Sequence, residues 1–386
     1  MTILFCVLSA FFLLLAAHPF VTYPLSLKII RRLSGPPAAS QVARSGPGRP
    51  LRLAICMCAY NEERVIRQKM SNLLALREHD PELDILVYVD GATDRTAEIL
   101  RDYTDKIQLF ISHERHGKTH GMNLLVSHAT APVIVFTDTN VILERGALQK
   151  LRPYFDDSDV GCVCGHLVYT NPEESVTAAS GSLYWRLEEL TKRLEEETGS
   201  VMGADGSLFA IRRALHRPPP DHLIDDMYVS FMILLEGHRI VQATDVTAYE
   251  SSVSVPGEEF RRKMRIACQA FNVHRLLWRH IRQLDALTVY KYVSHKLIRW
   301  FAIYSLSMSL VFLLAALFGA GESLAAILLI CSILTGLVVG CLWTIKPFSQ
   351  VADLLIALAG AGFGVWQSIR GERYQTWVPA ASVRKA

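Results

Sequence analysis

The sequence has little net charge, no phosphate-binding P-loop, no internal repeat, and no low-complexity segment beyond one short Gly- and Pro-rich stretch. A formal charge of +3 on 386 residues is too small to indicate nucleic-acid binding, which needs concentrated basic charge. The absence of a repeat excludes a solenoid. What the chain does have is apolar residues, at 51% of the sequence with a mean hydropathy of +0.23, more than a soluble protein needs.

The spacing of the cysteines and histidines is wrong for a structural metal. Cys56 and Cys58 lie in one apolar run, and Cys162 and Cys164 lie in another. Alternate residues of a strand share a face, so we expect each pair to be buried as free thiols in a reducing compartment. A zinc site needs different spacing and further ligands, and the three histidines between residues 113 and 120 straddle a loop and a helix start.

Charge is absent from residues 1–27, which is long enough for a transmembrane helix of about 40 Å. A signal peptide would carry positive charge before the apolar run, whereas here Lys28, Arg31 and Arg32 follow it. The positive-inside rule then places the amino terminus outside the cell membrane and the next domain in the cytoplasm. Glycines and prolines indicate a linker over residues 28–50.

Charge is also scarce near the carboxyl terminus. Residues 296–318 and 323–345 contain long uncharged stretches and are predicted to be transmembrane helices, which makes the protein a multi-pass protein of the cell (inner) membrane. A third membrane segment over 350–369 is shorter and contains glycine, so a span, a re-entrant piece and an interfacial helix all stay open. The side of the tail, residues 370–386, depends on that choice.

Between these membrane segments, residues 51–255 alternate between short apolar runs and amphipathic stretches. The runs at 53–58, 84–89, 107–111 and 133–137 are strand candidates, and helical patterns separate them. This alternation predicts an α/β domain with a mostly parallel sheet flanked by helices. Ligands of such sheets bind beyond the carboxyl ends of the strands.

Polar residues follow three of these strands, so we expect them to share one cleft. Tyr60 and Glu62 follow the first strand, Asp90 ends the second, and Asp138 follows the fourth. Taken singly, Asp90 with its following glycine is explained as a turn and Asp138 as a helix cap. Their common placement at strand ends favours a site instead.

The chemistry of that cleft suits a diphosphate. Asp138 offers a carboxylate and Asn140 an amide oxygen, and a hard cation such as Mg²⁺ or Mn²⁺ prefers oxygen ligands of this kind. Lys118, after a glycine, is placed to meet a phosphate. Asp90 can accept a hydrogen bond from a nucleobase, against which the Tyr60 ring can lie.

The second half of the domain supplies candidates for the acceptor side. Residues 203–207, Gly-Ala-Asp-Gly-Ser, precede an apolar strand, and the glycines allow close approach of a ligand. Asp225 and Asp226 open a helix. Such residues commonly cap a helix, but a carboxylate at a cleft wall can also take the proton from an attacking hydroxyl.

In this order, the motifs Ala59–Glu63, Asp90–Asp94, Gly117–Asn123, Asp138–Asn140, Gly203–Gly206 and Asp225-Asp226 resemble the family 2 glycosyltransferases. They are most similar to the membrane-embedded branch that includes cellulose, hyaluronan and poly-N-acetylglucosamine synthases, over roughly residues 51–270. The resemblance implies a nucleotide-sugar-binding sheet of the GT-A type and an inverting transfer by one displacement. It also implies a nucleotide-diphosphate donor and a saccharide or lipid-linked acceptor in cell-surface polysaccharide synthesis.

The resemblance assigns roles residue by residue. Asp226 matches the catalytic base, and Asp138 with Asn140 matches the metal element. Asp205 lies near the acceptor in the family. The remaining matched positions are expected at the donor, and they are Ala59, Tyr60, Glu62, Asp90, Lys118, Asn123 and Arg265.

Two positions depart from the family pattern. The metal element ends in Asn140 where the family usually has Asp, which predicts weaker cation binding or binding through the phosphates alone. The Gln-x-x-Arg-Trp element of processive members corresponds to Arg262–Ile266, where Arg265 is kept and Ile266 replaces the Trp. The transfer of a single sugar or of a short oligomer is therefore an alternative to long-chain polymerisation.

Residues 256–285 also have the pattern of an amphipathic interfacial helix, with one apolar face and many arginines. Lipid contact alone, or lipid contact together with a diphosphate role for Arg265, both fit. Trp377 in the tail is either a surface anchor or a residue that approaches the site. A non-catalytic membrane receptor for a nucleotide or nucleotide-sugar is the rival function, favoured by Asn140 and Ile266. The sequence does not indicate whether partner subunits are needed.

Overall fold

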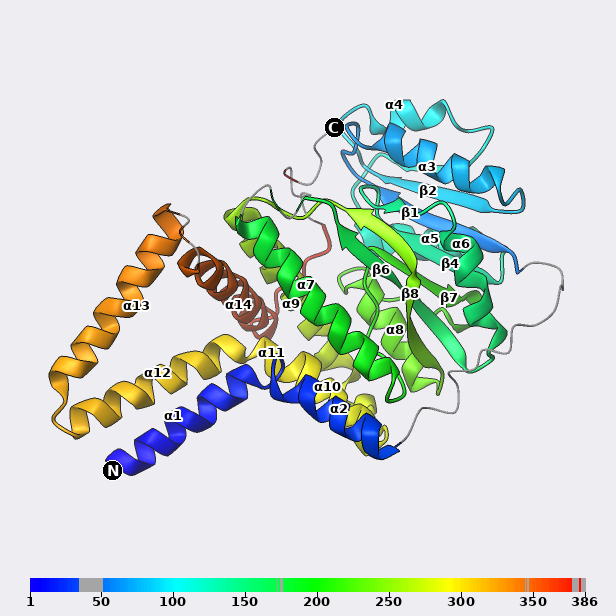
Figure 1. Cartoon of the computed structure of the whole chain (residues 1–386). Coiled ribbons are helices and arrows are strands. Elements are labelled where there is room, and N and C mark those ends of the chain that lie inside the picture. Colours follow the sequence, from blue (N-terminus) through cyan, green and yellow to red (C-terminus); the bar gives the residue numbers. More distant parts are fainter. Residues whose placement is uncertain are drawn as a thin grey trace.

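The alternating segments form one eight-stranded sheet (Figure 1). The computed structural model describes residues 1–34, 51–171, 173, 176–343, 345, 347–376 and 382, so Trp377 and most of the predicted linker lie outside the described residues. The sheet order is β3-β2-β1-β4-β7-β6-β8-β5. The strands are β1 (Leu53–Ala59), β2 (Asp84–Asp90), β3 (Gln108–Ser112), β4 (Val133–Thr137), β5 (Ile142–Leu143), β6 (Val160–Tyr169), β7 (Leu208–Arg212) and β8 (Arg239–Glu250).

The register of this sheet brings distant segments to one edge. Strands β1 to β4 are mutually parallel, as predicted, but β7 runs antiparallel to β4 and pairs Leu208 with Thr137. Strand β6 is antiparallel to β7 and parallel to β8, so Tyr169 pairs with Glu250. The carboxyl ends of β1, β2, β4, β6 and β8 and the start of β7 therefore meet at the same edge. The sheet is mixed, and the predicted α/β class is confirmed.

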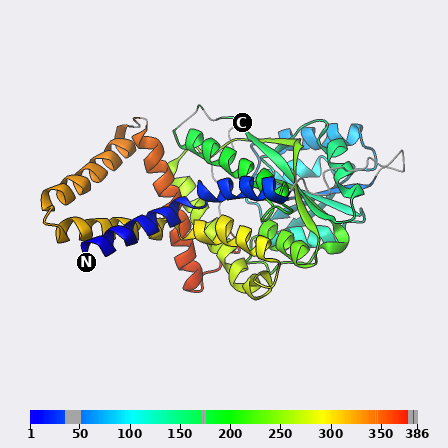
Figure 2. The same cartoon turned by 60° about the horizontal axis from the view of Figure 1, so that its bottom comes forward.

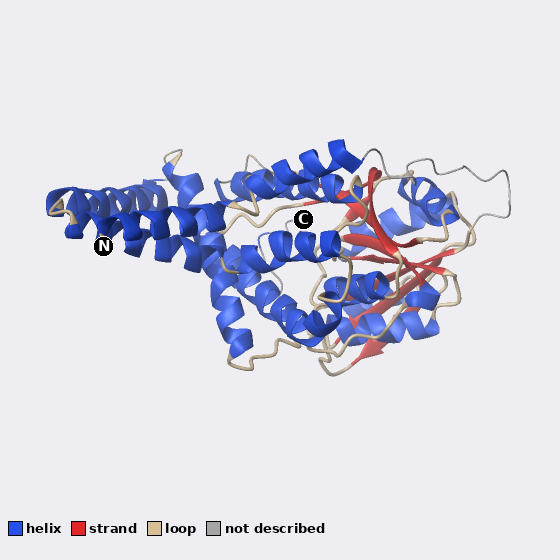
Figure 3. Cartoon of the chain, turned by 90° about the horizontal axis from the view of Figure 1, so that it is seen from below, coloured by secondary structure: helices blue, strands red, loops and turns tan. Residues whose placement is uncertain are grey.

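Helices cover both faces of the sheet (Figure 3). Alternation along the strands explains the two layers: Ile55 and Met57 pack into one hydrophobic cluster, and Ala54 and Cys56 into the other. All eight cysteines are free thiols, and Cys56 is fully buried. The first cluster includes residues of α3 (Ile66–Glu78), α4 (Thr96–Arg101) and α6 (Ala147–Leu151), which η1 (Arg152–Asp156) follows. The second includes residues of α5 (Lys118–His128), α8 (Asp225–Leu235) and α9 (Pro256–Ile281).

The amino-terminal segment is two helices where one was predicted. Helix α1 (Thr2–Ala17) and helix α2 (Thr22–Ser34) meet at an angle of 67°, next to Pro19, which has no backbone N–H for a continuing helix. Part of the apolar surface of α2 packs on protein, since Tyr23 and Leu27 are fully buried against Leu194. Helix α2 also includes residues 28–34, which were predicted to be linker.

Within the described residues, three carboxyl-terminal helices are long and apolar enough to cross a membrane, and the bent pair would make a fourth. Helices α12 and α13 project away from the sheet, with α1 beside α12 (Figures 1 and 2). Ser9 and Ser309 join α1 to α12, each hydroxyl donating to the other's carbonyl over 2.9 Å. These helices are α12 (Ala302–Gly319), α13 (Ser323–Trp343) and α14 (Phe348–Ile369), and the short elements before them are η2 (Arg213–Leu215), α10 (Ala286–Tyr292), η3 (Val293–Leu297) and α11 (Ile298–Trp300).

Helix α14 covers the face of α9 that was predicted to contact lipid. A Cβ atom at Gly364 would lie 2.2 Å from the Met264 carbonyl oxygen and 2.9 Å from the Cys268 nitrogen, so the two backbones pack in direct contact. Cys268 is fully buried there. The prediction of a lipid-exposed apolar face was therefore wrong, because a periodic apolar stripe does not distinguish lipid from a neighbouring helix.

Candidate active site

A cavity of about 880 Å³ opens at the edge where the strand ends meet. Asp90, Asp138 and Asp226 all line it, although they come from three elements far apart in the sequence. Asp90 ends β2, Asp138 follows β4, and Asp226 lies in the first turn of α8. The convergence inferred from strand ends is thus present in the fold. The other predicted residues that line the cavity are Ala59, Tyr60, Glu62, Lys118, Asn140, Asp205 and Arg265.

Lys118 lies at the centre of the charged groups. It opens α5 directly after Gly117, whose φ of 94° is in the region that favours glycine. Its Nζ lies 2.7 Å from Asp138 Oδ1 and 3.9 Å from Asp225 Oδ2. Burial alone would lower the pKa of Lys118, but the Asp138 and Asp225 carboxylates raise it overall, so the ammonium stays charged.

Asp226 lies in the first turn of α8. Its Oδ1 accepts the Met227 N–H over 2.5 Å, and burial together with the adjacent Asp225 raises its pKa to about 7 against the opposing effect of Lys118. Gly206 lies directly against it, because a Cβ there would be 3.0 Å from Asp226 Oδ2 and 3.3 Å from Lys118 Nζ. The glycine thus leaves open the space between the acid and the lysine.

The loop that carries Asp138 and Asn140 is held by a lysine whose role the sequence did not indicate. Lys69 of α3 is fully buried and donates to Thr137 Oγ1 over 3.2 Å and to the Val141 carbonyl. Burial lowers its pKa to about 7. In the same loop, the Asn140 amide donates to Glu250 Oε1 over 2.9 Å. The loop between β4 and β5 is therefore held on both sides.

The oxygen donors at this loop fit a hard divalent cation. Asp138 supplies a carboxylate and Asn140 an amide oxygen, which is the donor chemistry that Mg²⁺ and Mn²⁺ prefer. Among the residues that the structure describes, no three His, Cys, Asp or Glu side chains are grouped as a complete metal site. A cation here would need further oxygens, which a bound diphosphate carries.

Residues 54–217 match the family profile described as Glycosyl transferase family 2. This part of the chain is similar to the family 2 glycosyltransferases. The chain is 24% identical over 195 residues to the poly-beta-1,6-N-acetyl-D-glucosamine synthase of Staphylococcus aureus (strain COL), an overlap of 49% of this chain and 47% of that one. It is 23% identical over 187 residues to the O-antigen chain rhamnosyltransferase WbaN of Salmonella anatum, which is 46% of this chain and 59% of WbaN. The chain thus spans about half the length of the curated relatives it matches.

A solved structure matches over almost the whole chain. The mannosyltransferase PcManGT from Pyrobaculum calidifontis, in complex with GDP-Man and Mn2+, aligns with a TM-score of 0.72 at 21% identity, covering 95% of this chain and 99% of that one. This likeness shows a shared fold, including the membrane-proximal helices. The predicted GT-A type of the glycosyltransferase domain is confirmed, as is the family resemblance.

Asp90 has hydrogen-bond partners that the sequence did not suggest. Its carboxylate is 3% exposed and accepts the backbone N–H of His116 over 2.7 Å and that of Gly117 over 3.0 Å. It therefore anchors the loop before Lys118. Beside it, the Arg115 guanidinium lies 3.5 Å from the centre of the Tyr60 ring. The contact of Asp90 and Tyr60 with a nucleobase stays a prediction.

Asn123 is the one predicted site residue that does not line the cavity. It lies within α5, and its amide donates to the Pro219 carbonyl over 2.9 Å. The motif Gly117–Asn123 therefore contributes Lys118 to the cavity, whereas Asn123 holds the chain that leads to α8. We do not retain Asn123 as a donor-binding residue.

Arg265 and Ile266 of α9 both line the cavity, so the predicted match of this stretch to an active-site element fits the structure. The Arg265 guanidinium donates to Gln269 Oε1 over 2.9 Å. Burial and the neighbouring Arg262 lower its pKa to about 10, so it remains a cation at neutral pH. Ile266 offers no aromatic ring for stacking on a sugar.

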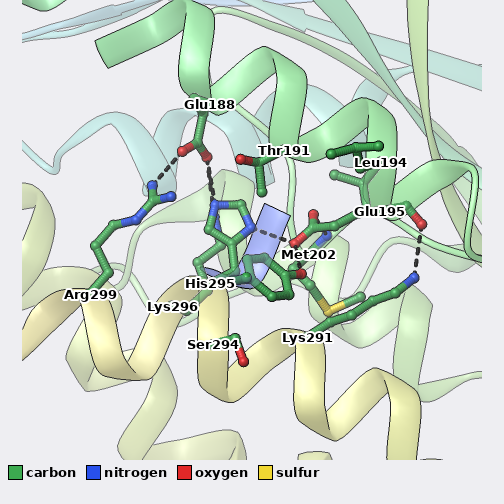
Figure 4. A network of polar contacts seen from close by, with 12 residues as sticks. Glu188, Thr191, Leu194, Glu195, Met202, Lys291, Ser294, His295, Lys296 and Arg299 are labelled. Atoms are coloured by element: carbon green, nitrogen blue, oxygen red, sulfur yellow. Dashed lines mark hydrogen bonds and ion pairs between the residues drawn. The ribbon is translucent and has the colours of Figure 1, made fainter. Parts of the chain in front are cut away.

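Helix α7 (Val176–Glu196) makes polar contacts both with Asp205 of the cavity and with residues of α2 and η3 (Figure 4). Lys192 forms a salt bridge with Asp205, and Glu195 accepts the Met202 N–H over 2.9 Å. Glu195 also contacts His295 Nδ1 at 2.6 Å, and Glu188 contacts His295 Nε2 at 2.9 Å. Tyr23 of α2 donates to Glu195 over 2.6 Å. Glu188 and Glu195 are both buried.

Proposed function

We propose that this protein transfers a sugar from a nucleotide-diphosphate donor to a saccharide or lipid-linked acceptor at the membrane, with inversion at the sugar carbon. One observation carries the proposal: Asp226 and Lys118 both lie beside Gly206, and Lys118 contacts Asp138 in the same cavity. A proton acceptor and a diphosphate-binding group are thereby within reach of one sugar. The match of residues 54–217 to the family 2 glycosyltransferase profile supports the reaction class.

The proposed mechanism is one displacement. Asp226 takes the proton from an acceptor hydroxyl, whose oxygen then bonds to the sugar carbon while the bond to the diphosphate breaks. Lys118 and Arg265 neutralise the departing diphosphate. Asp138 and Asn140 would hold Mg²⁺ or Mn²⁺, which supplies further positive charge at the leaving group. The solved mannosyltransferase of the same fold, bound to GDP-Man and Mn2+, supports this cofactor class.

The acceptor proposal rests on the other end of the cavity. Its lining includes Tyr184 of α7 together with Lys296 and Trp300, which lie just before α12 in the sequence. An acceptor at the membrane surface therefore has access to the base. Because Ile266 gives no stacking platform, we propose the addition of one sugar or a short oligomer, in an inner-membrane protein with its catalytic domain in the cytoplasm and its amino terminus outside.

The direct test is turnover of purified full-length protein in detergent with a panel of UDP- and GDP-sugars, Mn²⁺ and a membrane lipid extract. We expect release of the nucleoside diphosphate with at least one donor, and a labelled product that elutes as a short addition. Saturable nucleotide-sugar binding without turnover across the panel would instead favour the receptor function.

The activity is also expected to depend on pH in a way that identifies the base. Asp226 must be ionised to accept a proton, and its pKa is raised to about 7. The transfer rate should therefore fall as the pH drops through about 7, roughly tenfold per pH unit below it. Rates at saturating donor between pH 5 and 9 would measure this. A rate that is flat down to pH 5 would contradict the assignment.

A further inference from the structure

The cation site proposed above has one negative charge fewer than the family pattern provides. Asp138 is its carboxylate, while Asn140 contributes only a neutral oxygen. A divalent cation next to a diphosphate is held mainly by charge and by oxygen ligands. Either the site is weak, or a carboxylate from elsewhere in the fold supplies the missing charge.

The sheet brings such a carboxylate to the right place. Strand β5 pairs antiparallel with β8, with Ile142 opposite Tyr249, so the last residue of β8 comes beside the loop of the metal element. That residue is Glu250, and its Oε1 lies 2.9 Å from the Asn140 amide nitrogen. Glu250 lines the same cavity as Asp138 and Asn140, although it follows Asn140 by 110 residues.

We propose that Glu250 supplies the second carboxylate charge of the cation site, in place of the acid that position 140 lacks. This inference rests on the proposed function, because it takes the cation of the transfer reaction as its ligand. The site then combines two carboxylates, from Asp138 and Glu250, with one amide oxygen, and the donor diphosphate completes the set of oxygens.

The local contacts of Glu250 favour this role over a purely structural one. Its two hydrogen-bond donors are uncharged groups, the Asn140 amide and the Ser207 hydroxyl, the latter at 3.2 Å. They orient the carboxylate, while the Arg262 guanidinium is near enough to interact with it electrostatically. Glu250 and Lys69 both hold the loop, Glu250 through the Asn140 amide and Lys69 through Thr137 and the Val141 carbonyl. An uncharged acceptor could make both hydrogen bonds of Glu250, so its negative charge is available for a cation.

The same geometry predicts how the cation binds. No complete cluster of three metal-ligating side chains exists among the described residues, so the protein alone should bind the cation weakly. Tight binding should require a nucleoside diphosphate, which adds phosphate oxygens. Binding of Mn²⁺ in the presence of UDP or GDP is thus the readout, and it does not depend on turnover.

The experiment is a charge swap in the full-length protein. Free Mn²⁺ is measured by electron paramagnetic resonance in titrations with saturating UDP and, separately, GDP, for wild type, Glu250→Gln, Asn140→Asp and the double variant. We expect Glu250→Gln to weaken Mn²⁺ binding about 10- to 100-fold, the range found for residues that support a metal site. The double variant should recover most of that loss, because it restores two carboxylates in the pattern usual for the family.

The controls separate this inference from the proposed function. Glu258→Gln removes an equal charge from another carboxylate that lines the cavity and that accepts from Ser382, and it should leave Mn²⁺ binding unchanged. If wild type binds Mn²⁺ with nucleotide and Glu250→Gln binds it equally well, the inference is overturned and the proposed function stands. A double variant as weak as Glu250→Gln would also overturn it. If wild type shows no nucleotide-dependent Mn²⁺ binding, the proposed cation fails, and the role of Glu250 fails with it.

Discussion

Replacing Asp226 with Asn is expected to reduce sugar transfer by about 10³-fold or more, because the amide cannot take the proton from the acceptor hydroxyl. The substitution keeps the size of the side chain and its ability to accept the Met227 N–H. It also removes a buried charge whose pKa is already raised, so folding should not suffer. Nucleotide-sugar binding should change little. Initial rates of nucleoside diphosphate release, together with calorimetric titration of the donor, measure both effects.

Asp225→Asn is the matched control for this substitution. Asp225 is 5% exposed, adjacent in sequence, and 3.9 Å from Lys118, so it shares the electrostatic environment of Asp226. Its loss should lower the pKa of Asp226 by removing a like charge and should leave a functional base. Turnover in Asp226→Asn comparable to wild type, or an equal loss in both variants, would refute the assignment of Asp226 as the base.

The gathering of the acids could be predicted from the sequence because it depends on a simple rule of parallel sheets. Strands β1, β2 and β4 are continuous apolar runs, and polar residues follow each one. Parallel strands carry their carboxyl ends to one edge, so Tyr60, Asp90 and Asp138 had to meet there. Chain order and residue type were sufficient for this step.

The contribution of Glu250 could not be predicted in the same way. Strand β7 is antiparallel to β4, and β6 is antiparallel to β7. Strands β6 and β8 therefore run in the same direction as β4, and the last residue of β8, Glu250, comes to the edge that carries Asp138. A sequence gives no register for strands so far apart. Lys69 was equally hidden, since a lysine in an amphipathic helix normally lies on the solvated face, and here it is fully buried under the metal element.

In the membrane-proximal helices, the apolar residues were predicted correctly, but the surface against which they pack was not. The apolar stripe of α9 and the apolar residues Tyr23 and Leu27 of α2 are real, but they pack on α14 and α7 and do not face lipid. Hydrophobicity reports that a surface is buried and does not identify what buries it. The burial of the α7 acids could not be predicted either, because their partners His295 and Arg299 lie about a hundred residues away.

Replacing Lys118 with Met is expected to produce the second large loss, about 10²- to 10³-fold in turnover, which is the range for removing one electrostatic donor to a developing negative charge. Lys118 contacts Asp138 at 2.7 Å in this structure. Asp138 would hold the cation when the donor is bound, and the Lys118 ammonium would then be free to contact the diphosphate. Lys118 would therefore act both before and after the donor binds.

The pH profile separates this role from simple destabilisation. Lys118 lowers the pKa of Asp226, so its removal should move the midpoint of the pH–rate profile above about 7, and part of the lost activity should return at pH 9. Lys118→Arg keeps the charge and should leave the midpoint in place, although the larger guanidinium is expected to fit poorly beside Gly206. If the midpoint of Lys118→Met coincides with that of wild type, Lys118 does not act on the base, and the electrostatic coupling between Asp226 and the diphosphate site is refuted.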